Sequence, residues 1–203
     1  MPDTRPDTRL TLDLALTIRH DGQGGVADDL DATEGLTRWV RVHPDTLGGV
    51  PDGHWQADAV TLAAVRSLRA AVRALFAHAV RPGEPSPADA RRLLSVTEAL
   101  ERLNAAAAAV PTVAVLAWPE GGEPMAADRP ATAAGPEAVA ATLARAAIGF
   151  LAGPDRSSLR ACHAPRCVRY FLKEHPRQEW CKPSCGNRAR VARHHERHRV
   201  PQP

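Results

Sequence analysis

The chain has 203 residues, of which 44% are hydrophobic and only 4% aromatic, and its net charge is +3. This length suits one domain of ordinary size plus a small appendage, with an aliphatic and mostly helical core. The first residues are polar and Pro111 interrupts the longest apolar run. We therefore expect neither a signal peptide nor a membrane span, and we predict a cytoplasmic protein.

Charge is distributed unevenly along the chain. From Arg160 onward there are 11 basic and 3 acidic residues, whereas residues 1–159 hold 15 basic and 20 acidic residues. An acidic body with a basic end indicates that the end binds a polyanion, although a solvated basic tail without a partner has the same composition.

The body is predicted to be α+β and mostly helical. Apolar and small polar residues alternate from Leu10 to Ile18, which predicts a half-buried strand. A short helix is expected from Thr33, and the clearest helix runs from Asp58 to Val80, with apolar residues at every third or fourth position. Three arginines fall on its other face and are expected to be solvated: Arg66, Arg69 and Arg73.

A second long helix is predicted from Ser86, because a serine cap followed by Pro87 and Asp89 suits a helix start. Its expected buried stripe is Leu93, Val96, Leu100 and Leu103. Residues 112–118 and 124–128 flank a Glu-Gly-Gly-Glu turn and predict a β-hairpin. A third helix is expected from Pro136 to Gly153. We place the boundary between a regulatory body, residues 1–155, and a C-terminal finger, residues 156–203.

All four cysteines lie in the C-terminal segment, in two close pairs: Cys162 with Cys167, and Cys181 with Cys185. Two such pairs separated by 13 residues have the spacing of a four-thiolate zinc site. A knuckle would supply one pair and a helix start the other, as in a treble-clef finger. Because a four-thiolate site leaves no coordination position open, we expect one structural Zn²⁺ and no catalytic role for it.

Residues beyond the fourth cysteine predict a basic helix. The arginines expected to contact nucleic acid are Arg190, Arg193, Arg197 and Arg199. Their charges repel one another, and DNA phosphates would relieve that repulsion, while arginines in the major groove can bind guanine. A solvated helix, or one docked on the acidic body, is the alternative. The residues expected to brace the finger are Trp180, Gly186, Asn187 and Arg188.

The tetrapeptide Cys-Gly-Asn-Arg that begins at Cys185, with Trp180-Cys181 before it, resembles the signature of the CGNR zinc-finger family. Pro165 and Phe171 also fall where that family has them. Two departures stand out. Lys173-Glu174-His175 replaces an Asp-x-Ser or Asp-x-Thr of the family, and Leu16-Thr17 replaces the usual Asn-Thr at the end of the first strand.

The body resembles the ABATE domain, the usual partner of this finger, over Leu12–His20, Leu68–Leu75 and Leu103-Asn104. The resemblance implies a stress-induced transcription regulator. The chain shows no ordered set of nucleophile and base and no phosphate-binding glycine loop, so we do not expect an enzyme.

The sequence therefore predicts a regulator that binds double-stranded DNA, with a body that senses a small-molecule effector or forms a homodimer, and with no membrane partner. Two alternatives stay open. The finger could clamp its helix to a protein partner as an interaction adaptor, or the chain could bind RNA.

Overall fold

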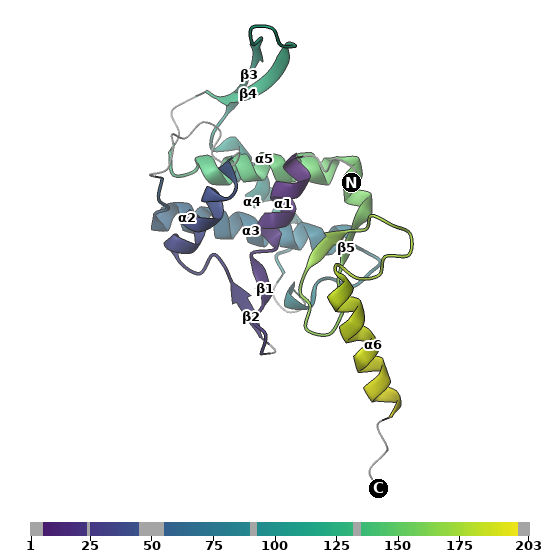
Figure 1. Cartoon of the computed structure of the whole chain (residues 1–203). Helices are drawn as coiled ribbons and strands as arrows, with labels where there is room; N and C mark the ends of the chain where they lie inside the picture. The colour runs from purple at the N-terminus through teal and green to yellow at the C-terminus, as the bar shows by residue number, and fades with distance from the viewer. Residues whose placement is uncertain (1–5, 24, 45–54, 90–92, 132–134, 199–203) are drawn as a thin grey trace.

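The computed structural model describes residues 6–23, 25–44, 55–89, 93–131 and 135–198, and within these ranges the chain is α+β, as predicted. The body helices are α1 (Pro6–Ala15), α2 (Thr33–Arg41), α3 (Ala59–Ala79), α4 (Val96–Ala108) and α5 (Ala138–Ala152). Helices α3, α4 and α5 pack on one another, and α1 packs on α5 and α3 (Figure 1). No helix in the described ranges is both long enough and apolar enough to cross a membrane.

The core between these helices is mainly aliphatic, as the composition predicts. Val65, Leu68 and Val72 of α3 and Leu143 of α5 are almost completely buried. Each such side chain contributes about 1.5–3 kcal/mol through the apolar surface it removes from water. Aromatic rings close one end of the core: Phe76 lies edge-on to Phe150 at 5.4 Å and to Tyr170 at 5.3 Å between ring centroids.

Helix α3 has the predicted bounds but not the predicted polar face. Asp58 caps it by accepting a 2.7 Å hydrogen bond from the Thr61 amide. Arg66 is exposed, whereas Arg69 and Arg73 are only 6% and 4% exposed, so the prediction that all three are solvated is wrong. Neighbouring elements also cover the side of α3 that carries Arg69 and Arg73. A guanidinium buried there needs a carboxylate partner, because an unpaired buried charge is strongly destabilising.

The N-terminal segment is helical where a strand was predicted, and only β1 (Ile18–His20) is extended. In α1 the buried positions include Thr8, Thr11 and Leu14, which recur every third residue. Thr11 tolerates burial because its hydroxyl donates a 2.7 Å hydrogen bond to the carbonyl of Asp7. The alternating leucines suggested the two-residue period of a strand. The buried face has the period of a helix instead, and threonines occupy part of it.

The second predicted helix starts at α4, with Ser95 and not Ser86 as its cap. The Ser95 hydroxyl accepts a hydrogen bond from the Glu98 amide at 3.1 Å. Of the predicted stripe only Leu103 is buried, and α4 packs through the face that also carries Ala99. The other three residues of that stripe are exposed: Leu93, Val96 and Leu100.

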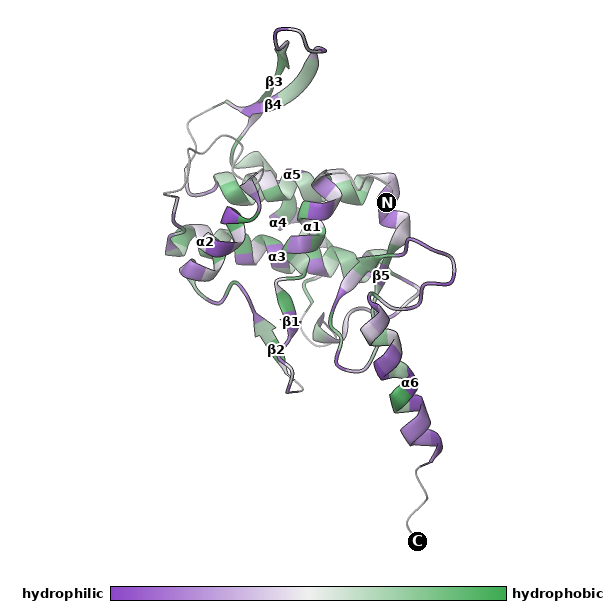
Figure 2. Cartoon of the chain, viewed as in Figure 1, coloured by the Kyte–Doolittle hydropathy of each residue, from purple (hydrophilic) through white to green (hydrophobic). Residues whose placement is uncertain are grey.

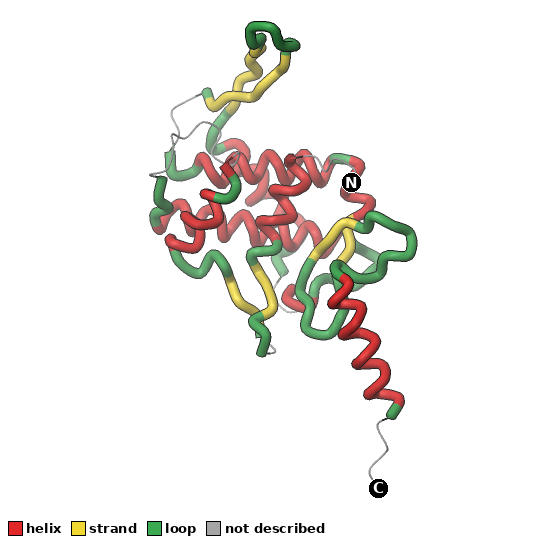
Figure 3. The backbone as a smooth tube through the Cα atoms, viewed as in Figure 1, coloured by secondary structure: helices red, strands yellow, loops and turns green. Residues whose placement is uncertain are grey.

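Six strands in the described ranges form three separate antiparallel pairs. Strand β1 pairs with β2 (Val26–Asp28). The predicted hairpin is present as β3 (Thr112–Ala117) and β4 (Met125–Pro130), and it projects away from the helices (Figure 3). The third predicted helix is α5, which buries its expected apolar face and ends at Gly153.

The C-terminal segment consists of β5 (Leu159–Ala161), β6 (Tyr170–Leu172) and α6 (Pro183–Arg197). Strands β5 and β6 pair with each other, and their side chains Leu159 and Tyr170 belong to the same hydrophobic core as the body helices. Helix α6 points away from the rest of the molecule (Figure 1). The strand pair of the C-terminal segment therefore shares the core of the body, whereas α6 points away from it.

Candidate zinc centre and basic helix

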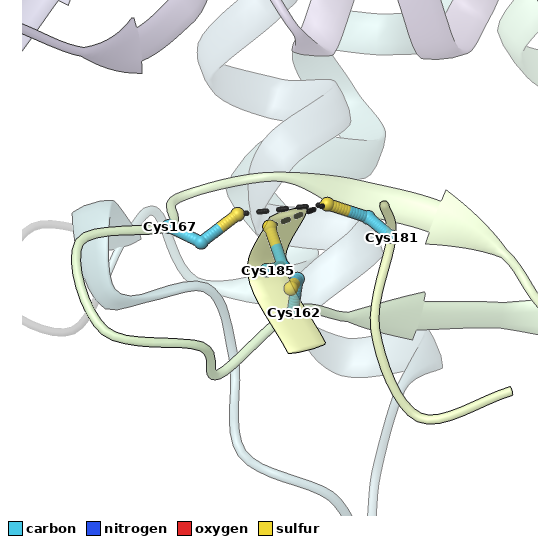
Figure 4. Close-up of side chains that lie close together, drawn as sticks. All are labelled: Cys162, Cys167, Cys181 and Cys185. Atoms are coloured by element: carbon cyan, nitrogen blue, oxygen red, sulfur yellow. Dashed lines mark hydrogen bonds between the residues drawn. The ribbon is translucent and has the colours of Figure 1, made fainter. Parts of the chain in front are cut away.

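The four cysteines meet at one point between β6 and α6. Cys162 follows β5, Cys167 ends the knuckle before β6, Cys181 precedes α6, and Cys185 lies in the first turn of α6. Figure 4 shows the four sulfurs turned toward one another. All four Sγ atoms lie within 4.8 Å of one another, and none of the cysteines is in a disulfide.

The cluster has the size of a zinc site. Zinc binds thiolates at about 2.3 Å in a tetrahedron, which places neighbouring sulfurs about 3.8 Å apart. The Sγ atom of Cys181 lies 3.6 Å from that of Cys167 and 3.5 Å from that of Cys185. These separations are too long for a disulfide bond and match the edges of that tetrahedron. The predicted cofactor, one structural zinc ion, is confirmed by this cluster and by the finger family reported below.

Electrostatics also favour a cation at the centre of the cluster. Hydrogen bonds from the thiols of Cys167 and Cys181 hold the pKa of Cys162 far below that of a free thiol. The same contacts with Cys162 raise the pKa of Cys167 and of Cys181. Thiols this close oppose one another's ionisation, and a divalent cation would relieve the repulsion among the thiolates that bind it.

A small hydrophobic cluster separate from the main core surrounds the sulfurs. Phe171 is buried in it, and the half-buried Trp180 packs against it. A Cβ atom added at Gly186 would lie 3.1 Å from Cδ1 of Trp180, so glycine allows the indole to approach the first turn of α6 closely. The geometry is that expected of residues that hold the finger together.

Arg188 crosses from α6 to the knuckle, and Asn187 does not. The Nε atom of Arg188 donates to the carbonyl of Pro165 at 3.0 Å, and its Nη2 lies 3.1 Å from the Cys185 sulfur. Asn187 is exposed, and its side-chain oxygen accepts a hydrogen bond from Arg190. Arg188 therefore has contacts that suit a bracing role, whereas Asn187 contacts the next turn of its own helix.

Helix α6 presents the predicted arginines to solvent. Cys185, Gly186 and Ala189 are buried, and beyond Ala189 every described side chain except the half-buried Ala192 is exposed. Three of the four predicted nucleic-acid residues lie there: Arg190, Arg193 and Arg197. The fourth, Arg199, lies outside the described residues. At about 100° per residue, the first three point within an arc of roughly 60°.

Sequence reasoning missed a buried polar network that joins the finger to the body. Arg73 donates to Asp89 through Nε at 2.8 Å and through Nη2 at 3.0 Å, and the Tyr170 hydroxyl donates to the same carboxylate at 2.7 Å. The Ser86 hydroxyl donates to the carbonyl of Val168 at 2.9 Å. Ser86 and Asp89, which the sequence pattern assigned to a helix start, are therefore held by hydrogen bonds to the finger. Because Asp89 and Tyr170 are 81 residues apart, no local pattern in the sequence indicates their contact.

Two family models match the chain. The ABATE model, described as "Putative stress-induced transcription regulator", matches residues 8–154, and the CGNR zinc-finger model matches residues 158–198. No curated protein matches the chain. Neither description names a catalytic activity, and the two matches cover the body and the cysteine cluster respectively. The chain therefore belongs to the ABATE family and carries a CGNR zinc finger.

Proposed function

We propose that the chain regulates transcription by binding double-stranded DNA through α6. The observation that carries the proposal is the outer half of this helix, which is exposed, basic and not neutralised. Among residues 190–198, Glu196 is the single acidic residue, and no described residue forms an ion pair with Arg190, Arg193 or Arg197.

A helix of this kind has little reason to be stable alone. Helix α6 is about 22 Å long at 1.5 Å per residue, and only its first turns pack against the finger. Isolated helices of this length are marginal in water, and clustered positive charges weaken them further. Figure 2 shows that the outer half of α6 is mostly hydrophilic. A polyanion along this exposed face would remove the repulsion between its positive charges.

The dimensions of the helix suit the major groove. This groove is about 12 Å wide and admits one α-helix, and an arginine side chain can donate two hydrogen bonds to guanine. Val191, which is 55% exposed, lies beside the arginine face and offers an apolar contact of the kind that a thymine methyl group requires. The zinc ion would act at a distance, by fixing where α6 begins.

Among the described residues of the finger, no Tyr, Phe or Trp ring is fully exposed as a platform for single-stranded RNA. Proteins that bind single strands stack bases on exposed aromatic rings. Here Tyr170 and Phe171 are buried, and Trp180 packs against the cysteine cluster. Duplex DNA is therefore favoured over RNA, and the adaptor hypothesis remains as the outcome to expect if DNA does not bind.

Dimerisation through the β3–β4 hairpin is part of the proposal, because one helix offers a small interface with DNA. In the described residues these strands pair only with each other, so both hairpin edges carry unpaired backbone groups. Its exposed apolar side chains are Val113, Leu116 and Met125, with Trp118 beside them. A second copy could add its own strands to such an edge.

Selection of binding sites from fragmented genomic DNA tests the proposed function. The zinc-loaded full chain should enrich a limited set of sites, arranged as paired half-sites if the protein is a dimer. The same selection with Arg190→Ala, Arg193→Ala and Arg197→Ala combined should lose the enrichment. Equal enrichment with and without these arginines would exclude α6 as the DNA-binding element.

A further inference from the structure

A basic cavity lies where the body meets the zinc finger, at the opposite end of α6 from the exposed arginines. Its volume is 440 Å³, within the range of pockets that bind small molecules. β1, the cysteine knuckle and the first turns of α6 all contribute to its wall. The nitrogen-bearing side chains that line it are Arg19, His20, Arg166, Arg169, Lys182 and Arg188, and no described carboxylate lines it.

Nearby negative charges neutralise only some of the basic side chains that line the cavity. Arg19 is paired with Asp29 at 2.6 Å, and Arg188 contacts a cysteine sulfur of a site that carries a charge of −2 once four thiolates hold Zn²⁺. Arg166, Arg169 and Lys182 form no ion pair with any described residue. Positive charge in excess of its neighbours therefore faces the cavity.

His20 supplies an unused hydrogen-bond donor in the same wall. The Gly22 amide donates to Nδ1 of His20 at 2.8 Å, so the proton of the neutral ring lies on Nε2. This Nε2 is buried and has no hydrogen-bond partner among the described residues.

The start of α6 adds to the positive potential. Its cap residue is Lys182, which has no side-chain acceptor for the first amides of the helix. The partial positive charge of the helix N-terminus therefore has no capping side chain from Lys182 and adds to the charge of the basic residues. Ser184, in the first turn, also lines the cavity.

We propose that this cavity binds a small phosphorylated anion that bridges β1 of the body and the zinc finger. Phosphate oxygens suit the arginines, the lysine and the helix start that line the cavity. The bound anion would add a second contact between the finger and the body, beside the buried contacts of Tyr170. The proposal goes beyond DNA binding and does not require that α6 contact DNA.

Arg166 is the best position for a test because its backbone already has a left-handed conformation, with φ of 61°. Glycine adopts this conformation without the strain that other residues carry, so Arg166→Gly removes the guanidinium without a backbone penalty. Arg166→Lys keeps the charge. Arg177→Ala is the matched control, because Arg177 is an exposed arginine of the finger outside the cavity.

The measurement is isothermal titration of the zinc-loaded full chain with inorganic pyrophosphate, with zinc content checked before and after. Wild type and Arg177→Ala should bind one pyrophosphate per chain. Arg166→Gly should bind at least about 10-fold more weakly, because a hydrogen bond to a charged group contributes about 1.5–3 kcal/mol. Arg166→Lys should lie between wild type and Arg166→Gly. The variant that lacks Arg190, Arg193 and Arg197 should bind pyrophosphate as wild type does.

Two results would overturn the small-anion proposal. One is pyrophosphate binding that is absent, or equally strong in wild type and Arg166→Gly. The other is binding of duplex DNA that weakens in Arg166→Gly while pyrophosphate has no measurable affinity, because the cavity would then hold a DNA phosphate. If pyrophosphate binds as described and no DNA binds, the proposed function fails and this proposal stands.

Discussion

The hydroxyl of Tyr170 in the zinc finger donates a 2.7 Å hydrogen bond to the Asp89 carboxylate in the body, where Arg73 donates to the same carboxylate. All three side chains are buried. The Arg73 guanidinium also lies 5.3 Å from the centre of the Tyr170 ring. This network sets the orientation of β6 on the body and, through the cysteines, the direction in which α6 leaves the molecule.

Removing Asp89 should destabilise the protein strongly. In Asp89→Ala the buried Arg73 loses its counter-charge, and breaking one side of a buried pair costs about 3–5 kcal/mol. Asp29→Ala is the matched control, because Asp29 and Arg19 form an exposed pair that contributes less than about 1 kcal/mol. Urea unfolding monitored by circular dichroism measures the unfolding free energy of each variant. Equal unfolding free energies for the two variants would show that the network is not a major source of stability.

The chain contains a single tyrosine, so the tyrosinate absorbance that appears on ionisation reports on Tyr170 alone, because the four tryptophans do not ionise. Burial, and then the charge of Asp89, raise the pKa of Tyr170 above its usual value. The folded protein should therefore show no tyrosinate near pH 10, where an exposed tyrosine ionises. Because the folded pKa is the higher one, this group favours the folded state below the unfolded pKa, and its contribution falls as pH rises above it. Ordinary titration near pH 10 in the folded protein would contradict the buried contact.

Zinc should be lost when a cysteine is replaced and kept when the neighbouring histidine is replaced. Cys162→Ser removes one of the four ligands. His163 is the next residue along the chain, but its side chain is exposed and it is not part of the cysteine cluster. Metal analysis should give one zinc per chain for wild type and His163→Ala, and clearly less for Cys162→Ser. The same loss should lower the melting temperature of the whole chain, because Tyr170 and Leu159 lie in the common core. Full zinc content in Cys162→Ser would remove Cys162 from the site.

The hairpin should hold two copies together. Leu116 is 70% exposed on β3, and a charge there would oppose contact with a second hairpin. Sedimentation should show a dimer for wild type and a monomer for Leu116→Glu. Val26→Glu is the control, since Val26 is 50% exposed on β2, a strand that lies on the other side of the helices from the hairpin (Figure 1). A wild-type monomer, or a Leu116→Glu dimer, would exclude the hairpin as the interface.

The zinc centre could be predicted almost completely from sequence because its signal is local. Metal ligands are specified by cysteine spacing, and the four sulfurs meet as that spacing predicts. Helices α3 and α5 were also predictable, since each buries one continuous apolar face. In these cases a short window of sequence contains all the information that the structure uses.

The errors arose where distant partners decide the structure. The segment from Leu10 became a helix because threonines share its buried face, and none of the described strands pairs with it there. Ser86 suggested a helix start, but its hydroxyl bonds to the backbone of Val168 in the finger. Arg69 was expected in solvent, but it forms a two-point ion pair with Asp28 across 41 residues. Such partners cannot be inferred from spacing within one element.

The most direct test of the central claim, that the arginines of α6 bind DNA, is the salt dependence of duplex affinity. Fluorescence anisotropy with a labelled duplex should give a steep linear fall of log Kobs with log salt. Replacing Arg190, Arg193 and Arg197 by alanine keeps a good helix former and should reduce the slope by roughly 2 to 3. Alanine at three exposed arginines of the body, Arg38, Arg41 and Arg66, changes the net charge equally and should leave the slope as it is in wild type. Equal slopes and affinities for wild type and the α6 variant would contradict the account.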